Sequence, residues 1–93
     1  MSNIKILTLK DTETLIRQTL NEVYLTETQD NKTLTLSEET VLLETGLDSL
    51  GYAILVTRLE EEIGYDPFTL SSEAYYPLTF GELVLFYFEH MPK

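Results

Sequence analysis

Apolar residues recur at helical spacing in three separate stretches, and this pattern restricts the fold more than any other feature of the sequence. Each stretch starts behind a residue that can cap a helix. A helix with one apolar face has to bury that face against a neighbour. Because 93 residues make a single small domain, the pattern predicts an all-α four-helix bundle with three longer helices, one short third helix and a long first loop.

The first helix is expected to begin at Asp11 or Thr12, either of which can cap it, and to end near the polar run 26–33. Residues 1–10 are then an irregular or early helical lead-in, because a lone strand would have no partner. The loop that follows, 26–48, is long for so small a domain, and its apolar side chains are expected to tether it.

The second helix is expected to begin at Asp48 and Ser49 and to run to about Ile63, with Gly64 as its C-terminal stop. Its inward face is expected to carry the large apolar residues that recur at helical spacing, which are Tyr52, Leu55, Val56, Leu59 and Ile63.

A capping box of Thr79 and Glu82 marks the start of the last helix, which is expected over 80–90. Before it, the stretch 70–76 has room for one or two turns of helix, after Pro67 closes the preceding turn. This stretch is the expected short third helix.

Charge and composition exclude several classes of partner. Sixteen acidic and six basic residues give a net charge of −10, which opposes binding to nucleic acid or to anionic lipid, so partners are expected to carry basic patches. No stretch is long and apolar enough to cross a bilayer, and no membrane insertion is expected. The chain has no cysteine and no apolar leader at its N-terminus, so a cytoplasmic location is expected.

Residues suited to catalysis are scarce. His90 is the only histidine, and it lies far along the sequence from any candidate serine, so a Ser-His-Asp arrangement is not expected. Neighbouring carboxylates such as those of 60–62 are expected by chance in so acidic a chain and fit a solvated helix face. Since a calcium-loop pattern is also absent, we expect no metal site, no catalytic residue and no enzyme activity.

The segment 44–50 carries the one concentrated chemical signal. It places Ser49 at the positive end of the second helix, where a phosphate is favoured. Leu47 and Leu50, on either side, are expected to bury the turn and to push the hydroxyl outward. The alternative, favoured by the local pattern taken alone, is that Ser49 or Asp48 serves only as the helix cap.

Gly46-Leu47-Asp48-Ser49-Leu50 resembles the attachment motif of acyl carrier proteins and the related peptidyl carrier domains, whose serine holds a 4′-phosphopantetheine arm. Three flanking segments are also similar to the family: the approach to the motif, the acidic end of the second helix and the start of the last helix, which are 36–40, 59–64 and 79–83. By this resemblance, residues 11–93 are identified as a phosphopantetheine-binding carrier domain.

The resemblance implies that Ser49 accepts the arm from coenzyme A, with Asp48 as its orienting neighbour and Leu50 beside it. An acyl or aminoacyl group would ride on the arm as a thioester. The implied partners are a phosphopantetheinyl transferase, an acyl- or aminoacyl-loading ligase, and a downstream synthase or transferase of a fatty acid, polyketide or other specialised pathway. The carrier is expected to be a monomer. The rival interpretation is an unmodified helical adaptor that binds partner proteins through its second helix.

The exposed side of the second helix departs from the family pattern. In place of acidic and methionine-like residues it has four others, which we expect to dock partners: Gly51, Ile54, Thr57 and Arg58. On this interpretation Leu50 and Ile54 form an apolar patch. The alternative is that Ile54 turns inward and that Gly51 is merely a tolerated helical glycine.

Three aromatic residues gather around the expected third helix, namely Tyr75, Tyr76 and Phe80. They could line a cleft for an acyl chain, but aromatic residues at this spacing are more often ordinary core residues, which is the interpretation that we favour.

Overall fold

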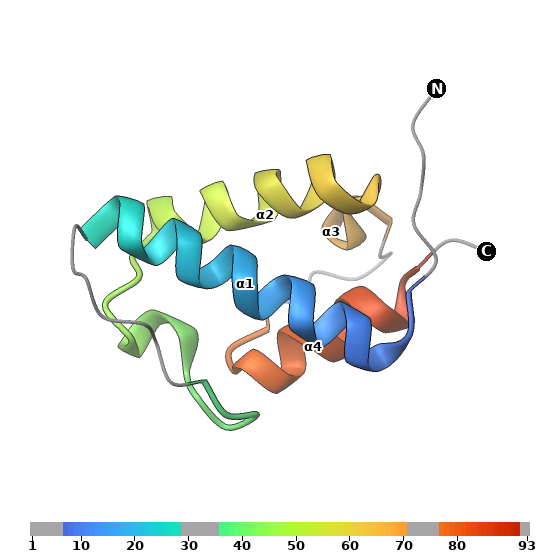
Figure 1. Ribbon diagram of the computed structural model, residues 1–93, viewed down its shortest axis with the longest axis horizontal. Helices are drawn as coiled ribbons and strands as arrows, with labels where there is room; N and C mark the ends of the chain where they lie inside the picture. The colour runs from blue at the N-terminus through green and yellow to red at the C-terminus, as the bar shows by residue number, and fades with distance from the viewer. Residues whose placement is uncertain (1–6, 29–35, 71–76, 92–93) are drawn as a thin grey trace.

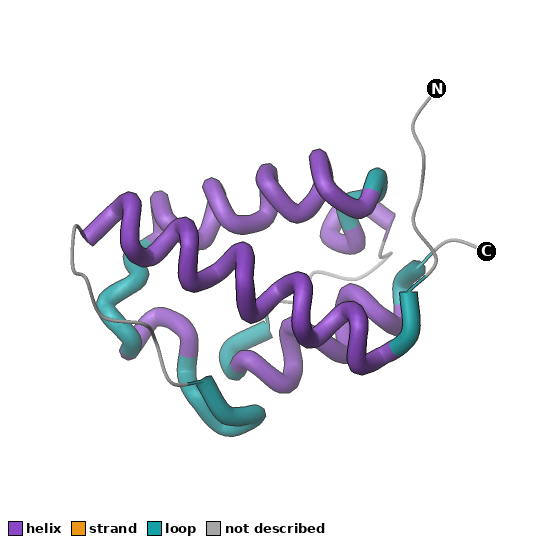
Figure 2. Tube along the Cα trace, viewed as in Figure 1, coloured by secondary structure: helices purple, strands orange, loops and turns teal. Residues whose placement is uncertain are grey.

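A computed structural model describes residues 7–28, 36–70 and 77–91 of the chain. Figure 1 shows α1 lying alongside both α2 and α4, and α1 is the helix that packs against each of them. The described residues form helices and connecting loops without a named strand (Figure 2), which confirms the all-α fold. The elements in chain order are α1 (Leu9–Thr28), the 3-10 helix η1 (Leu42–Glu44), α2 (Ser49–Ile63), α3 (Pro67–Leu70) and α4 (Phe80–Glu89).

The start of α1 differs from the expected one. The hydroxyl of Thr8 accepts a hydrogen bond from the amide of Asp11 at 3.1 Å, and the Thr8 carbonyl accepts one from the amide of Thr12 at 2.9 Å. Thr8 therefore satisfies the first amides of the helix, which is the work of a cap. The expected cap at Asp11 or Thr12 is wrong, and α1 begins at Leu9, inside the lead-in 1–10.

Both ends of α2 are as predicted. The carboxylate of Asp48 accepts a hydrogen bond from the amide of Gly51 at 2.8 Å, so Asp48 is the N-cap. Gly64 adopts the left-handed conformation with φ of 87°, and its amide donates to the carbonyl of Glu60 at 2.8 Å. A glycine is the residue best suited to that conformation, so the helix ends there.

The predicted capping box of α4 is also confirmed. The hydroxyl of Thr79 accepts a hydrogen bond from the amide of Glu82 at 3.1 Å, and the Glu82 carboxylate accepts one from the amide of Thr79 at 3.0 Å. Two amides that the helix itself leaves unpaired are satisfied in this way.

The short third helix begins earlier than expected. Pro67 is the first residue of α3, whereas the sequence suggested that it closes a turn. A proline suits the first position of a helix, because its φ is already helical and no amide is needed there. The carboxylate of Asp66 accepts a hydrogen bond from the amide of Phe68 at 2.9 Å and secures this start. Most of the stretch in which the helix was expected, 71–76, lies outside the described residues.

Three helices supply most of the core. Each buried leucine or isoleucine contributes about 1.5–3 kcal/mol of transfer free energy, so these faces hold the bundle together. The core side chains with at most 1 % of their surface exposed include Ile16, Leu20 and Val23 of α1, Leu55, Leu59 and Ile63 of α2, and Phe80, Leu83 and Tyr87 of α4.

The end of the long loop is fixed to the start of α4. The amide of Phe80 donates to the carbonyl of Thr40 at 2.8 Å, and the amide of Leu42 donates to the carbonyl of Leu78 at 2.9 Å, around a single antiparallel bridge between Val41 and Thr79. Apolar side chains tether the loop as predicted at Leu36, Leu42 and Leu47, which are buried, but Leu43, which was expected to contribute, is exposed. This attachment sets the position from which α2 begins.

In the part of the chain that the structure describes, no helix combines the length and the apolar character needed to cross a membrane.

Candidate functional site

Ser49 is the first residue of α2, and it is exposed. No hydrogen bond joins its side chain to another described residue. The cap of the helix is Asp48, whose carboxylate holds the amide of Gly51 and whose carbonyl accepts from the amide of Tyr52 at 2.9 Å. The hydroxyl of Ser49 is therefore not needed for capping, and it stands among the first amides of a helix of 15 residues.

The turn in front of α2 fixes the direction of the helix. Gly46 has φ of 103°, a left-handed conformation that other residues rarely adopt. A Cβ atom at this position would also meet the ring of Tyr24 at 3.3 Å, so the turn rests directly on α1. The hydroxyl of Thr45 donates to the carbonyl of Leu42 at 2.6 Å and ties the turn to η1. Sequence reasoning missed the role of Tyr24, since no local pattern reveals it.

The two leucines around the serine differ from each other. Leu47 is buried, with 2 % of its surface exposed, and it anchors the turn as expected. Leu50 has 63 % of its surface exposed, so the expectation that it buries the turn is wrong. The reason is geometric, because in a helix that begins at Ser49 the residues facing the core are Gly51, Tyr52 and Leu55. Leu50 is left as an apolar side chain next to the serine.

Gly51 does not lie on the exposed side of α2. It is buried, and a Cβ atom on it would come within 2.6 Å of the Cδ1 atom of Leu47. The prediction that Gly51 docks a partner is therefore wrong, because Leu47 covers this residue and a partner cannot reach it. The sequence already indicated this burial. Gly51 lies four residues before Leu55 and eight before Leu59, which places all three on the same face of the helix.

The other three expected docking residues have different environments. Ile54 is half-buried and packs against the core. Thr57 is exposed, and its hydroxyl donates to the carbonyl of Ala53 at 3.0 Å. The guanidinium group of Arg58 is paired with the carboxylate of Glu22, which links α2 to α1. Since both side chains of this pair are largely in solvent, the pair adds little to stability and leaves the charge accessible.

The described residues hold no group of three or more His, Cys, Asp or Glu side chains placed to bind a metal ion. Nδ1 of His90 lies 3.0 Å from the carbonyl oxygen of Phe86, and its ring packs on the ring of Phe86 with 4.5 Å between centroids. The end of α4 and the start of α2 lie at opposite ends of the molecule (Figure 1), so His90 is not brought to Ser49.

Of the three aromatic residues considered for an acyl cleft, Phe80 belongs to the core. Phe80 has 1 % of its surface exposed, and the guanidinium group of Arg17 lies 4.8 Å from the centre of its ring. Tyr75 and Tyr76, which were considered with it as an acyl cleft, lie outside the described residues. Burial raises the pKa of Tyr65 and raises the pKa of Tyr87 far above its ordinary value.

The arrangement at the start of α2 is suited to receive a group on oxygen. It offers an unengaged hydroxyl, a helix N-terminus that favours negative charge, and the apolar side chain of Leu50 alongside. It offers no neighbouring base that would make Ser49 a nucleophile by itself, within the ranges 7–28, 36–70 and 77–91.

Comparison of the chain with protein-family models, with curated proteins and with solved structures finds no match.

Proposed function

We propose that this chain is an acyl carrier protein, which holds an acyl or aminoacyl group as a thioester on a 4′-phosphopantetheine arm attached to Ser49. The observation that carries the proposal is the exposed hydroxyl of Ser49 at the first position of α2, which has no hydrogen-bond partner among the described residues. The resemblance of the segment 46–50 to the attachment motif and the small all-α bundle support the same function.

Attachment of the arm is a phosphoryl transfer from coenzyme A. The Ser49 oxygen forms a bond to the phosphorus that carries pantetheine, the bond from that phosphorus to the bridging oxygen of the diphosphate breaks, and adenosine 3′,5′-bisphosphate leaves. The hydroxyl proton passes to a base of the transferase. The resulting phosphodiester carries one negative charge beside the helix N-terminus, a position worth about 0.3–1 kcal/mol to an anion.

The chain itself supplies a tether and a surface to its partners. The thiol that carries the cargo comes from the arm, which fits a chain without cysteine. Holding the cargo on an arm raises its effective concentration at a docked enzyme. The proposed partners are the phosphopantetheinyl transferase, a loading ligase and a downstream synthase or transferase, which would meet the exposed Leu50 and the outer part of Ile54.

Intact-mass measurement tests the proposal directly. The chain is incubated with coenzyme A and a phosphopantetheinyl transferase of broad specificity, and we expect one added pantetheine phosphate. Ser49→Ala should remain unlabelled. Its helix content should be unchanged, because Asp48 rather than Ser49 caps α2 and exposed changes of this kind usually alter stability by less than about 0.5 kcal/mol.

Ser37→Ala is the matched control, since Ser37 is exposed like Ser49 but lies in the loop before η1 rather than in the attachment motif. It should accept the arm as the original chain does. An unlabelled original chain, or equal labelling of Ser49→Ala, would reject the attachment site.

A second candidate is an unmodified adaptor, and the exposure of Leu50 in α2 and of Leu43 in η1 favours it, because exposed apolar side chains can bind a partner without any arm. The two functions differ in their dependence on Ser49. An adaptor keeps its partner in Ser49→Ala, whereas a carrier loses every covalent load.

A further inference from the structure

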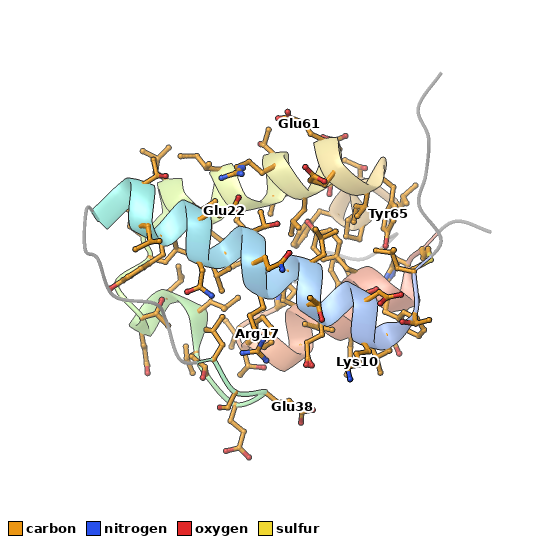
Figure 3. All side chains as sticks on the ribbon, viewed as in Figure 1. Lys10, Arg17, Glu22, Glu38, Glu61 and Tyr65 are labelled. Carbon is orange, nitrogen blue, oxygen red and sulfur yellow. The ribbon has the colours of Figure 1, made fainter. Side chains whose placement is uncertain are left out.

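A groove with a volume of about 440 Å³ lies between the start of α1 and the start of α4, away from Ser49. Its walls belong to the first two turns of each helix, to Thr79 and to the loop at Glu38. Figure 3 shows Lys10 and Glu38 at one edge of the molecule and Glu61 of α2 at the opposite edge. The groove is therefore separate from the outer face of α2 that the proposed carrier function uses.

The groove is already formed in the isolated chain. The amide of Gly81 donates to the carbonyl of Glu38 at 3.0 Å, and a Cβ atom on Gly81 would meet that same oxygen at 2.9 Å. Only a glycine allows the loop to lie this close to α4. Arg17 donates to the carbonyl of Leu36 at 2.7 Å, and its guanidinium group lies over the ring of Phe80, which lines the groove. A preformed site avoids the free-energy cost of ordering its walls on binding.

The groove combines an apolar surface with an acidic rim. Leu9 and Leu85 line it with 44 % and 47 % of their surfaces exposed, although the core of the same helices is almost completely buried. The charged lining consists of one cation and three carboxylates, which are Lys10, Glu13, Glu38 and Glu82. Two of these carboxylates also make contacts within the chain, Glu13 with Arg17 and Glu82 with the amides of Leu78 and Thr79. Apolar side chains flanked by carboxylates suit an occupant that is apolar on one side and positively charged beside it.

We propose that this groove docks a helical segment of a partner protein that presents leucine-sized side chains on one face and lysine or arginine next to them. A groove between the beginnings of two helices can take a helix that lays its apolar face into it. A second copy of this chain is opposed by the charge of −10 that each copy carries, and an anionic lipid surface is opposed for the same reason.

The probe is a synthetic helical peptide with leucines at positions i, i+3, i+4 and i+7 and lysines beside them. It is titrated into the full-length, ¹⁵N-labelled chain, and the backbone amide signals are followed. We expect the shifts to concentrate on the first turns of α1 and α4 and on residues 38–40. A peptide with glutamates in place of the lysines should not bind.

Two variants locate the binding. Leu85→Ser should weaken the peptide roughly tenfold, as expected for an apolar contact at the centre of an interface. Leu43→Ser is the matched control, because Leu43 is exposed to a similar degree, 43 %, but belongs to η1 and does not line the groove. It should bind the peptide like the original chain, and Ser49→Ala should do so too, whatever becomes of the carrier function.

Shifts that concentrate on the start of α2, equal binding of the acidic peptide, or unchanged affinity of Leu85→Ser would each overturn the proposal. The chain alone could instead sediment as a dimer that Leu85→Ser converts to a monomer. That result would mean that a second copy occupies the groove, and it would also overturn the proposal.

Discussion

Gly51 shows how one missing side chain determines the shape of the candidate site. A glycine inside a helix costs about 1 kcal/mol relative to alanine, so a helical glycine calls for a compensating contact. Here the contact is with Leu47, whose Cδ1 atom occupies the space that a Cβ atom would take. The buried Leu47 in turn closes the turn from which Ser49 is presented. Gly51 thus shapes the site indirectly, because it leaves room for the buried Leu47.

We predict that Gly51→Ala lowers the free energy of unfolding by about 1–3 kcal/mol, the usual cost of overpacking, in spite of the better helix propensity of alanine. Urea denaturation followed by circular dichroism measures the change. In the background of Leu47→Ala the clash is removed, so there the same substitution should instead stabilise the chain by about 1 kcal/mol. If Gly51→Ala stabilises the original chain as well, Leu47 can move aside and its packing does not require a glycine.

Helices with strong local signals were predictable, and those set by contacts between elements were not. The caps at Asp48 and Gly64 and the capping box of α4 depend on residues within a few positions of one another, so the sequence contains them completely. The start of α1 was missed because the expected caps, Asp11 or Thr12, already lie inside the helix, where Thr12 is buried, and the cap is Thr8 in the lead-in.

At the site, Ser49 was expected to be exposed because Leu47 and Leu50 would bury the turn; Ser49 is exposed, but only Leu47 is buried. The pairing of Arg58 with Glu22 and the contact of Gly46 with Tyr24 join residues that lie far apart in the sequence. No periodicity or spacing contains such contacts, because they depend on how α1 packs against α2 and the turn before it.

Two tyrosines connect the segment before α3 to the end of α4. The hydroxyl of Tyr65 donates to the carbonyl of Tyr87 at 2.7 Å, one of the last carbonyls of α4, which the helix leaves without an internal partner. The Tyr87 side chain is fully buried, and its hydroxyl has no hydrogen-bond partner among the described residues. Both rings belong to the core and lie 6.2 Å apart.

We predict that the free energy of unfolding decreases in alkali because of these two tyrosines. Burial raises the pKa of Tyr65 and Tyr87 above their ordinary value of 10.0, so in the folded chain both stay protonated where an unfolded chain loses the protons. The stabilisation is therefore complete below about pH 10 and declines as the pH rises above it, by up to about 1.4 kcal/mol per tyrosine and pH unit. Urea denaturation at a series of pH values from about 8 to 11 measures the decline.

Tyr87→Phe is the matched variant, because it removes an ionisable group without breaking a hydrogen bond of the described residues. At neutral pH it should be at least as stable as the original chain, since an unsatisfied buried hydroxyl costs about 1–3 kcal/mol. Above pH 10 its decline should be shallower. Tyr65→Phe should lose stability at neutral pH, because the carbonyl of Tyr87 is left unpaired. An equally steep alkaline decline in Tyr87→Phe would contradict the assignment.

The charge of the whole molecule opposes its compact state. The net charge is −10, and the ion pairs between described residues, Glu13 with Arg17 and Glu22 with Arg58, are partly exposed to solvent, where such pairs contribute little. The last turn of α2 adds to the electrostatic repulsion, because it carries the carboxylates of residues 60–62 and no basic residue. Negative charge at a helix C-terminus is unfavourable, since that end already has a partial negative charge.

We predict that the melting temperature rises when sodium chloride is added, because the screening length falls from about 10 Å at 0.1 M salt to about 3 Å at 1 M. Glu60→Gln with Glu61→Gln brings the net charge from −10 to −8 and relieves the end of α2, so this double variant should melt at a higher temperature in low salt. It should also gain less from added salt. That smaller gain separates screening from any general effect of salt on apolar burial, which both chains share. A melting temperature that does not change with ionic strength, or an equal gain in both chains, would show that self-repulsion does not limit the stability of this bundle.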